Sequence, residues 1–561
     1  MSEISPSLKA ARDEAAISQG TRPTSLQNVH SILDDQVISN TQITHPDLPL
    51  GDDGSEEYRR LGKGHPFKTL VVQSLGPLMF NFFTALNTMI ISVYVTKALP
   101  NANAALSAIT IANIPECIAN AFAWALFIGC SCTVGRYLGA GDVRSAQAAA
   151  IHAFVLGLSG SVGLLLILLF TVKPLLRSTS SEEYSADILD LALRYIVVLI
   201  FAVPVTTVYF SLTGIAAGSG MVTLVTVMAV LEIVLTLGLF CPLYLFAVKP
   251  LGIAGASLGI VTTRLLLSCV YLWFYIKKMT VRMNWKLICE YRTTKFIREV
   301  LSVGVIDMIS SLSATVILGI ISSFIAQLGT GYARTYYKDS TQEEQKGIYE
   351  EVIAAWGCLN RVYSMAVMIS FGITGGYLPA ASYALGRKHY RRFIQLTWYC
   401  FAYDCTALLL FSIIFIIVIP WFCKVFSNTN TYVDLSISTV RIMLATGVIL
   451  PFQFIITTIC QACLMTLVGI ILGLTTQVAL LPLSFIIIFY ACRHFIAPNV
   501  KLRINLNMLA FTFNDVLSAI ISMGVWCVPM RKYKRLAAEQ EALQGNASFI
   551  PTSQISHSPP A

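Results

Sequence analysis

About twelve long apolar stretches divide this sequence, and each is long enough to cross a lipid bilayer as a helix. A helix needs about 20 apolar residues to cross a hydrocarbon core of about 30 Å. Hydrophobic residues make up 55% of the chain and charged residues only 12%, which leaves too little polar surface for a water-soluble protein. Because backbone groups in lipid must bond internally, we predict an all-α polytopic membrane protein. The predicted spans are residues 69–96, 104–134, 145–172, 187–214, 220–247, 251–276, 296–328, 352–382, 393–420, 432–465, 466–491 and 507–529.

Lysine and arginine gather in alternate predicted loops, which predicts the orientation of the chain in the membrane. The basic clusters lie at residues 59–68, 277–298, 387–392 and 531–535. Cytoplasmic loops are enriched in these residues, so both termini are predicted to be cytoplasmic. The net charge of +9 is then explained by the basic cytoplasmic loops and does not indicate a nucleic-acid partner. The polar residues 1–66 and the chain beyond Leu536 are predicted to be disordered.

Several residue pairs recur at similar distances, which indicates an internal duplication. The pairs are Gly141 and Gly386, Arg194 and Arg441, Pro204 and Pro451, and the Ser-x-Gly motifs that begin at Ser74 and Ser302. The last pair is closer together because the polar segment 329–351 lengthens the second half. The predicted domains are a cytoplasmic tail (1–66), a six-helix lobe (67–276), a basic cytoplasmic linker (277–295), a second six-helix lobe (296–530) and a cytoplasmic C-terminal tail (531–561).

Both halves place a glycine turn between their second and third helices. The turns read "YLGAGD" at 137–142 and "SYALGRKHYRR" at 382–392. Glycine adopts the left-handed conformation that caps a helix C-terminus without steric cost, so Gly141 and Gly386 are predicted to take it. Asp142 is predicted to cap the next helix with its carboxylate.

A duplicated pair of six-helix lobes suits a carrier that opens a central cavity first to one side of the membrane and then to the other. The sequence has no G-x-x-x-x-G-K-[ST] phosphate loop, so we expect secondary transport without a nucleotide, a cofactor, a metal centre or enzymatic activity. Adaptable apolar walls with a few acids would suit small organic substrates, often cationic, and the lipid bilayer is the other expected partner. The oligomeric state, a monomer included, and the choice between plasma and internal membranes stay open.

Four motifs together resemble the multidrug and toxic compound extrusion (MATE) family of cation-coupled antiporters. They are the two glycine turns, "SLGPL" at 74–78 and "PLGIAGASLGIVTTR" at 250–264. The resemblance covers about residues 66–535. It implies two pseudo-symmetric six-helix lobes and export of amphipathic organic compounds in exchange for H⁺ or Na⁺.

Ionisable residues near the bilayer centre are costly and are candidates for ion coupling. Glu232, Glu116 and Arg264 lie near the middle of the fifth, second and sixth predicted spans. The resemblance places the family's fifth-helix acid at Glu232, with a site for H⁺ or Na⁺ beside it. A second family acid, in the first helix, falls on Asn87, which cannot carry a proton, so Glu116 is the candidate to replace it.

Three interpretations of Glu232 stay open. It takes up and releases the coupling ion, it forms a permanent ion pair with Arg264 that joins helices five and six, or it contacts the substrate directly. Arg264, Asn81 and Asp307 are candidates for substrate binding or for stabilising a lobe. For Asp307, and likewise for Asp404 and Asp515, we favour a solvated or helix-capping role over coupling.

Aromatic and methionine side chains are candidates to line a cavity, although packing or lipid contact is favoured for each. They are Phe82, Phe83, Tyr209, Trp356, Tyr363 and Met365. A lipid-linked precursor flippase is the alternative function, and it predicts a strongly basic central cavity. A channel or receptor is disfavoured by the duplication and by the charges near the bilayer centre.

Overall fold

The computed structural model describes residues 56–99, 102–179, 186–248, 251–277, 281–282, 284–291, 294–336, 342–424, 429–495 and 500–547. Every regular element in these ranges is a helix, which confirms the all-α prediction. Each predicted span coincides with one helix or with two or three consecutive ones. By length and mean hydropathy, eight described helices are able to cross a membrane, or up to nine if one bent pair counts as a single span.

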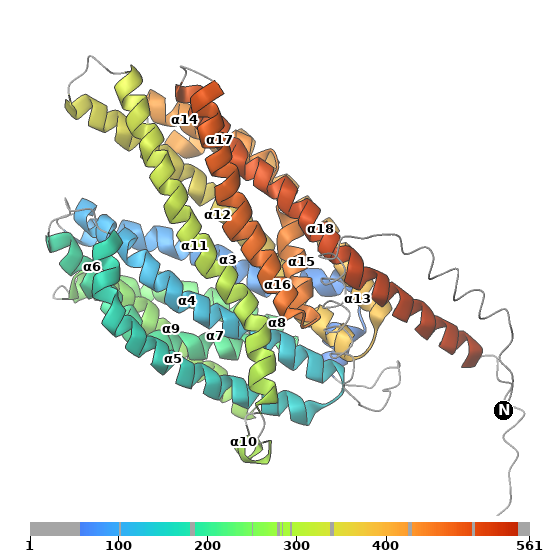
Figure 1. Ribbon diagram of the computed structural model, residues 1–561. Coiled ribbons are helices and arrows are strands. Elements are labelled where there is room, and N and C mark those ends of the chain that lie inside the picture. The colour runs from blue at the N-terminus through green and yellow to red at the C-terminus, as the bar shows by residue number, and fades with distance from the viewer. Residues whose placement is uncertain are drawn as a thin grey trace, which may run out of the picture. The chain divides into compact units, whose positions relative to one another are not determined.

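The helices fall into two series of similar pattern (Figure 1). The first contains α3 (Pro66–Ala98), α4 (Ala102–Gly139), α5 (Val143–Thr179), α6 (Ala186–Phe201), α7 (Val203–Gly218), α8 (Val222–Leu235), the π-helical η2 (Thr236–Phe240) and η3 (Leu243–Ala247), and α9 (Ala254–Lys277). The second contains α11 (Lys295–Tyr336), α12 (Gln342–Gly386), α13 (Tyr390–Lys424), α14 (Asn430–Leu444), α15 (Pro451–Ala462), α16 (Thr466–Gly473), the π-helical η5 (Leu474–Leu480), α17 (Leu481–Phe495) and α18 (Val500–Ala547). The short elements η1 (Tyr58–Gly62) and α10 (Lys286–Glu290) lie outside both series.

The fourth span is broken at the same place in both series. In the first, α6 ends at Phe201 and α7 begins with Pro204 in its first turn, with a bend of 49° between them. In the second, α14 ends at Leu444 and Pro451 opens α15. Proline has no N–H to donate, so the first turn of a helix is the place where it costs no hydrogen bond. The repeated prolines therefore mark the same helix break in each half.

Helices α4 and α12 cross where each carries a glycine. A Cβ atom on Gly139 of α4 would clash with the carbonyl oxygen of Tyr383 in α12, and one on Gly386 would clash with that of Arg136. Both members of this reciprocal contact repeat after 247 residues. The same shift of 247 residues separates the repeated arginines and the repeated prolines. Equivalent residues of the two halves therefore contact each other at this crossing, as expected where a pseudo-two-fold axis passes between α4 and α12.

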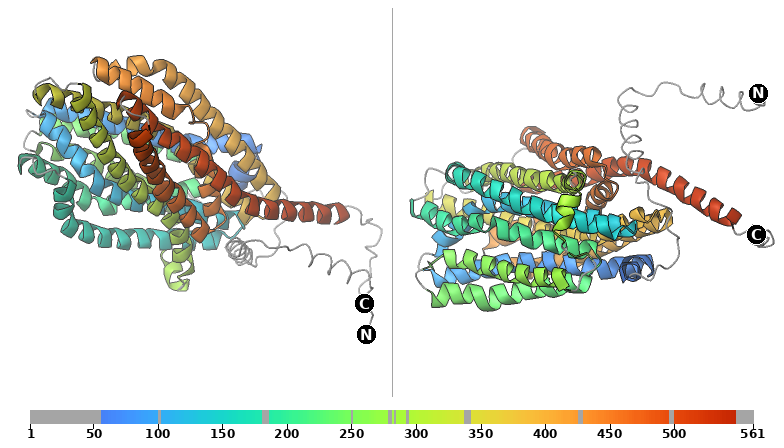
Figure 2. Two further views of the ribbon diagram at one scale, coloured as in Figure 1. Left: turned by 45° about the horizontal axis from the view of Figure 1, so that its top comes forward. Right: turned by 90° about the horizontal axis from the view of Figure 1, so that it is seen from below.

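Two further helix pairs join the halves. Gly376 of α12 lies against the backbone of Ser74 in α3, and Gly129 of α4 lies against that of Val300 in α11. Figures 1 and 2 show α4 and α11 side by side, as their contacts require. The glycine-rich helix ends thus allow backbones of different halves to approach each other closely.

The glycine-turn prediction is correct for the first half and wrong for the second. Gly141 has φ 76°, and Asp142 accepts a hydrogen bond from the Ser145 amide at 2.9 Å, as a capping residue does. In the second half Lys388, with φ 57°, holds the left-handed position instead of Gly386. The reason is that Gly386 corresponds to Gly139, and both are needed for the helix crossing.

A second pair of turns joins the fourth and fifth spans of the halves. Gly220 (φ 71°) and Leu464 (φ 55°) hold the left-handed positions. We call the end of the bundle that carries the turns at 139–142, 218–221, 386–389 and 462–465 the turn end. It is the side predicted to be cytoplasmic.

The predicted tails are shorter than expected at both ends. Helix α18 continues to Ala547, so the prediction of disorder beyond Leu536 is wrong up to that residue. Residues 56–66 include the helical turn η1, whose Leu61 side chain is fully buried, so they are packed and not disordered. Residues 1–55 and 548–561 lie outside the described residues.

Candidate functional sites

A buried ion pair lies in the first half between the fifth and sixth spans. The Arg264 Nε of α9 donates to Oε1 of Glu232 in α8 at 3.0 Å, and each side chain is only 12% exposed. The Tyr209 hydroxyl of α7 donates to the other carboxylate oxygen at 3.0 Å. Both oxygens of Glu232 are therefore bonded, one to a cation and one to a hydroxyl.

Arg264 also contacts two other groups around the helix break. Its Nη1 lies 3.4 Å from Thr206 Oγ1, and its guanidinium carbon lies 5.6 Å above the centre of the Phe210 ring. It further interacts electrostatically with Glu116 of α4, which is half-buried. The structure thus pairs Glu232 with Arg264 and places Glu116, the third residue that the sequence singled out, within electrostatic range of Arg264.

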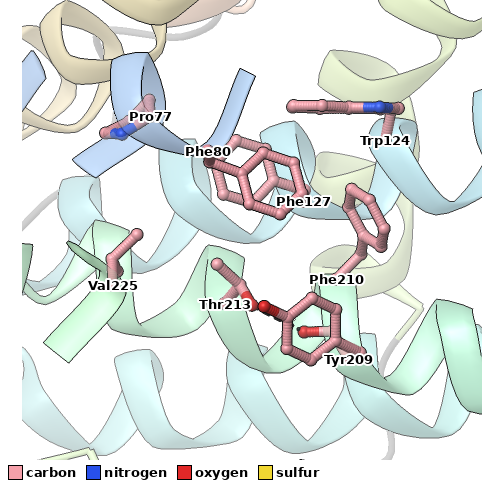
Figure 3. Close-up of a pocket in the computed structure, with 8 residues that line it drawn as sticks. All are labelled: Pro77, Phe80, Trp124, Phe127, Tyr209, Phe210, Thr213 and Val225. Atoms are coloured by element: carbon pink, nitrogen blue, oxygen red, sulfur yellow. Dashed lines mark hydrogen bonds between the residues drawn. The ribbon is translucent and has the colours of Figure 1, made fainter. Parts of the chain in front are cut away.

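An aromatic pocket, drawn in Figure 3, includes Tyr209 and Phe210, the two residues that contact this ion pair. Its lining residues are Pro77, Phe80, Trp124, Phe127, Tyr209, Phe210, Thr213 and Val225. Phe210 and Trp124 meet edge to face with ring centres 5.2 Å apart. Two successive residues of α7 connect the pocket to the charges, because Tyr209 bonds Glu232 while Phe210 lies under Arg264.

The pocket is nearly closed in this structure. Its cavity volume is about 10 Å³, room for about one water molecule. Pockets for drug-sized ligands typically measure about 300 Å³ or more. Binding an organic molecule here therefore requires the aromatic rings to separate.

A polar cavity of about 30 Å³ lies in the second half. Its lining residues are Asp307, Ser310, Phe371, Thr374, Gln453, Phe454, Thr457, Thr458, Gln461, Gly473, Thr476 and Gln477. Gln453 is only 4% exposed, and its Oε1 is buried with no hydrogen-bond partner among the described residues. Asp307, 8% exposed, forms no ion pair in the same part of the chain.

The hydroxyl groups around this cavity present oxygen lone pairs. Ser310 donates its hydrogen to the carbonyl of Ile306, Thr476 donates to Leu472, and Thr374 donates to Ser370. Thr457 and Thr458 donate to α15 carbonyls in the same way. Because these hydrogens are already used, the hydroxyl oxygens can act only as acceptors toward the cavity. Together with the Asp307 carboxylate, they form a lining suited to a cation.

The prediction that three acids of the second half are solvated or cap helices is wrong. Asp307, Asp404 and Asp515 are buried within the interiors of α11, α13 and α18. Asp404 accepts a hydrogen bond from Ser370 at 3.0 Å, and Asp515 accepts one from Thr446 at 3.5 Å. Asp404 and Asp515 each also have one oxygen buried with no described partner. Asp404 and Asp515 thus bond to hydroxyl groups of neighbouring segments, and Asp307 lines the polar cavity.

The two candidate asparagines lie apart from this bonding network. Asn81 of α3 is 2% exposed, and its amide nitrogen has no described partner. Asn87 is half-buried and its amide oxygen is likewise unpaired among the described residues. Glu232 bonds only to Arg264 and Tyr209 in this part of the chain. The role of Asn87 in an ion site with Glu232 stays a prediction.

A family model provides the assignment. The model named MatE matches residues 77–241 and 348–486, one segment in each half and together more than half of the chain. The chain belongs to the MatE family. Its members are transporters, and this MATE protein is accordingly a multi-pass integral membrane protein. None of the curated proteins compared with the sequence matches it.

Solved structures of MATE proteins share the fold of this chain. A MOP superfamily transporter from Pyrococcus furiosus Vc1, described by the reversed polarity of its binding pocket, is 18% identical with a TM-score of 0.73. A multidrug resistance MATE family transporter in an outward-facing conformation is 17% identical, also with a TM-score of 0.73. Each alignment covers 86% of this chain and 99% of the other. These similarities establish two pseudo-symmetric lobes of about six helices each.

Several site residues were missed by reasoning from the sequence. Thr206 and Gln453 each lie two residues after the repeated proline of their half, at the break in the fourth span. Each faces the site of its own half. The repeated prolines were the signal that could have found them. Of the proposed cavity aromatics, Tyr209 lines a described pocket, while Trp356 and Tyr363 pack against Phe511.

Proposed function

We propose that this MATE protein is a secondary active antiporter that exports amphipathic organic compounds, often cationic, in exchange for H⁺ or Na⁺. The observation that supports it most strongly is the Glu232 carboxylate, which is held between Arg264 and Tyr209 at the edge of an aromatic pocket. Aromatic faces attract organic cations. A carboxylate beside them is placed to exchange one positive charge for another.

The contacts suggest how ion and substrate exclude each other. When Glu232 takes up H⁺ or Na⁺, its attraction for the Arg264 guanidinium falls. Arg264 also covers the face of Phe210, so a movement of Arg264 away from the ring exposes that face to an organic cation. We expect the rings to separate for substrate in one state of Glu232 and to close in the other.

Asp307 is the second candidate to bind the coupling ion. It opens on a cavity lined by acceptor oxygens and has no described cationic partner. A small cation prefers such oxygen ligands, and Na⁺ or a proton carried on water would neutralise the carboxylate. The two halves then contribute separately, with the aromatic pocket in one and an ion site in the other.

The flippase alternative is less well supported. It requires a strongly basic cavity for a phosphate headgroup. Neither described cavity has a lysine or arginine in its lining, and Arg264 is already bonded to Glu232.

The test is gradient-driven accumulation of a fluorescent organic cation in liposomes that contain purified protein. We compare the wild type with Glu232→Gln, with the double variant Glu232→Gln/Arg264→Gln, and with Asp307→Asn. If Glu232 couples, both variants that lack it lose the response to an imposed H⁺ or Na⁺ gradient. If the pair is only structural, the double variant recovers transport, because no unpaired charge is left buried.

Asp404→Asn is the matched control for Asp307→Asn. Asp404 is also buried in the second half, but it bonds to Ser370 and does not line the cavity. Loss of gradient dependence in Asp307→Asn alone supports an ion site at the cavity. Unchanged coupling in Glu232→Gln and in Asp307→Asn contradicts both coupling roles, and wild-type protein without gradient-driven movement contradicts antiport.

A further inference from the structure

The segment that precedes α3 contacts both halves of the molecule at the turn end. It comprises residues 56–64, which contain the helical turn η1. The Leu61 side chain is fully buried, and Glu57 is 7% exposed. A surface loop has no need to bury such residues, so the segment is part of the packed structure.

On the side of the second half, two arginines hold the segment. Arg392 donates from Nη1 to the carbonyl of Gly64 and from Nη2 to that of Leu61, both at 2.8 Å. The guanidinium of Arg387 lies 4.5 Å above the centre of the Tyr58 ring. Charged hydrogen bonds and a close cation–π contact are among the stronger polar interactions in proteins.

On the side of the first half, the segment packs on the turn between α7 and α8. A Cβ atom placed on Gly220 would come within 3.0 Å of Leu61 Cγ. At the other side of the same segment, a Cβ atom on Gly62 would lie 3.3 Å from the ring of Tyr383 in α12. The segment therefore lies between a turn of one half and a helix end of the other.

The pseudo-symmetry of the halves shows what this position does. On the opposite side of the α4–α12 crossing, Arg136 of the first half donates directly to the carbonyl of Ala462 at the turn of the second half. The residue that corresponds to Arg136 after 247 residues is Tyr383, whose ring faces Gly62 of the segment. The segment fills this place, with Gly62 against Tyr383 and Leu61 against Gly220.

We propose that residues 56–64 form a strap that holds the turn ends of the two halves together, in the place where the symmetry-related contact is made by Arg136. The strap must leave this position before the bundle can open at the turn end. This inference rests on the alternating access of the proposed function, but its test measures opening and not transport.

The rate at which buried native cysteines react with a water-soluble reagent measures such an opening. Cys132 of α4 is fully buried and accepts a hydrogen bond from Ser382 of α12 at 3.2 Å, across the contact between the halves. Cys463, 3% exposed, lies in the turn that Arg136 contacts. Exposed Cys289 of α10 serves as the internal standard. The probe is a water-soluble maleimide, and modification of each cysteine is followed by peptide mass spectrometry.

The proteins compared are the full-length chain, deletions of residues 1–54 and 1–64, Arg392→Gln and Leu61→Ala. Arg391→Gln is the matched control, because Arg391 is exposed and contacts only Glu541 of α18 among the described residues. We expect Cys132 and Cys463 to react about tenfold faster in the 1–64 deletion, in Arg392→Gln and in Leu61→Ala, because each change removes contacts that stabilise only the closed state.

The deletion of residues 1–54 and Arg391→Gln are expected to react like the full-length chain. Arg392→Gln and Leu61→Ala keep the chain at full length, so they decide the question even if the longer deletion does not fold. Equal labelling of Cys132 and Cys463 in all these proteins overturns the strap. Faster labelling without any organic-cation transport supports the strap and leaves only the proposed function refuted.

Discussion

The two halves of this MATE protein repeat one helix pattern but differ in how they treat buried charge. In each half, the last span presents a charged side chain to the broken fourth span. In the first half this is Arg264, which contacts Thr206 and is neutralised by Glu232. In the second half it is Asp515, which contacts Thr446 and has no ion-pair partner in the described chain.

The difference extends to the cavities. The first half combines a neutralised pair with aromatic walls, and the second combines Asp307 with acceptor oxygens. A buried carboxylate without a cationic partner is unfavourable unless it binds a proton or a cation. The duplication thus conserved the framework at the glycine crossings and the prolines while the two polar interiors diverged.

The largest expected effect on stability comes from substituting the two glycines of the α4–α12 crossing, a feature that both halves share. Gly139→Leu and Gly386→Leu each place a side chain against the backbone of the facing helix, which cannot yield as a flexible side chain can. We expect each to destabilise the fold by more than about 3 kcal/mol and to leave no monodisperse protein in size-exclusion chromatography.

Gly357→Leu in the same α12 helix is the control, because nothing lies within 4 Å of a Cβ atom there. It is expected to fold. If Gly139→Leu and Gly386→Leu differ strongly from each other, the crossing is not the symmetric contact described above.

The next largest effect on stability is expected to differ between the two halves. Glu232→Gln leaves Arg264 buried without its ionic partner, so we expect a loss of about 3 kcal/mol in the free energy of unfolding. Asp307→Asn removes a charge that has no cationic partner, and we expect no loss of stability or a gain of about 1 kcal/mol. Thermal unfolding in detergent at one pH measures both. A similar loss in the two variants would falsify the distinction between a paired and an unpaired carboxylate.

The framework could be predicted from the sequence because it depends on long-range composition and on residues with special backbone properties. Apolar stretches located the spans, whereas the breaks at the repeated prolines were not predicted, because those prolines were used only as evidence of duplication. The ion pair between Glu232 and Arg264 was one of three interpretations left open, and it rested on consecutive antiparallel helices bringing their midpoints to a similar depth. These inferences need only the depth of a residue in the membrane.

The polar interior could not be predicted because it depends on which face of each helix looks inward. Asp307 was expected to be solvated, yet α12, α15 and η5 cover it. The acceptor lining arises from threonine rotamers, and the strap arises from a segment that composition alone marks as a tail. Periodicity was uninformative in spans whose neighbours are apolar on every side.

The smallest expected effect concerns the turn where the sequence misplaced the left-handed residue. Gly141 and Lys388 hold equivalent positions with positive φ. A side chain in that conformation costs free energy that glycine avoids. Gly141→Ala is therefore expected to lower stability by about 1 kcal/mol, whereas Lys388→Gly is expected to raise it by about 0.5 kcal/mol. Thermal unfolding midpoints measure both shifts.

Lys388→Ala separates the backbone effect from loss of the lysine side chain. Alanine keeps the left-handed strain of lysine but lacks its ammonium group, so the gain in Lys388→Gly must be measured against Lys388→Ala. If glycine and alanine at residue 388 give the same midpoint, strain in this turn is negligible. The two turns have equivalent backbone hydrogen bonds, from the Asp142 amide to the Tyr137 carbonyl and from the His389 amide to the Ala384 carbonyl. Equal midpoints would therefore show that the turns differ more than these bonds indicate, and that Gly141 serves another purpose than relief of strain.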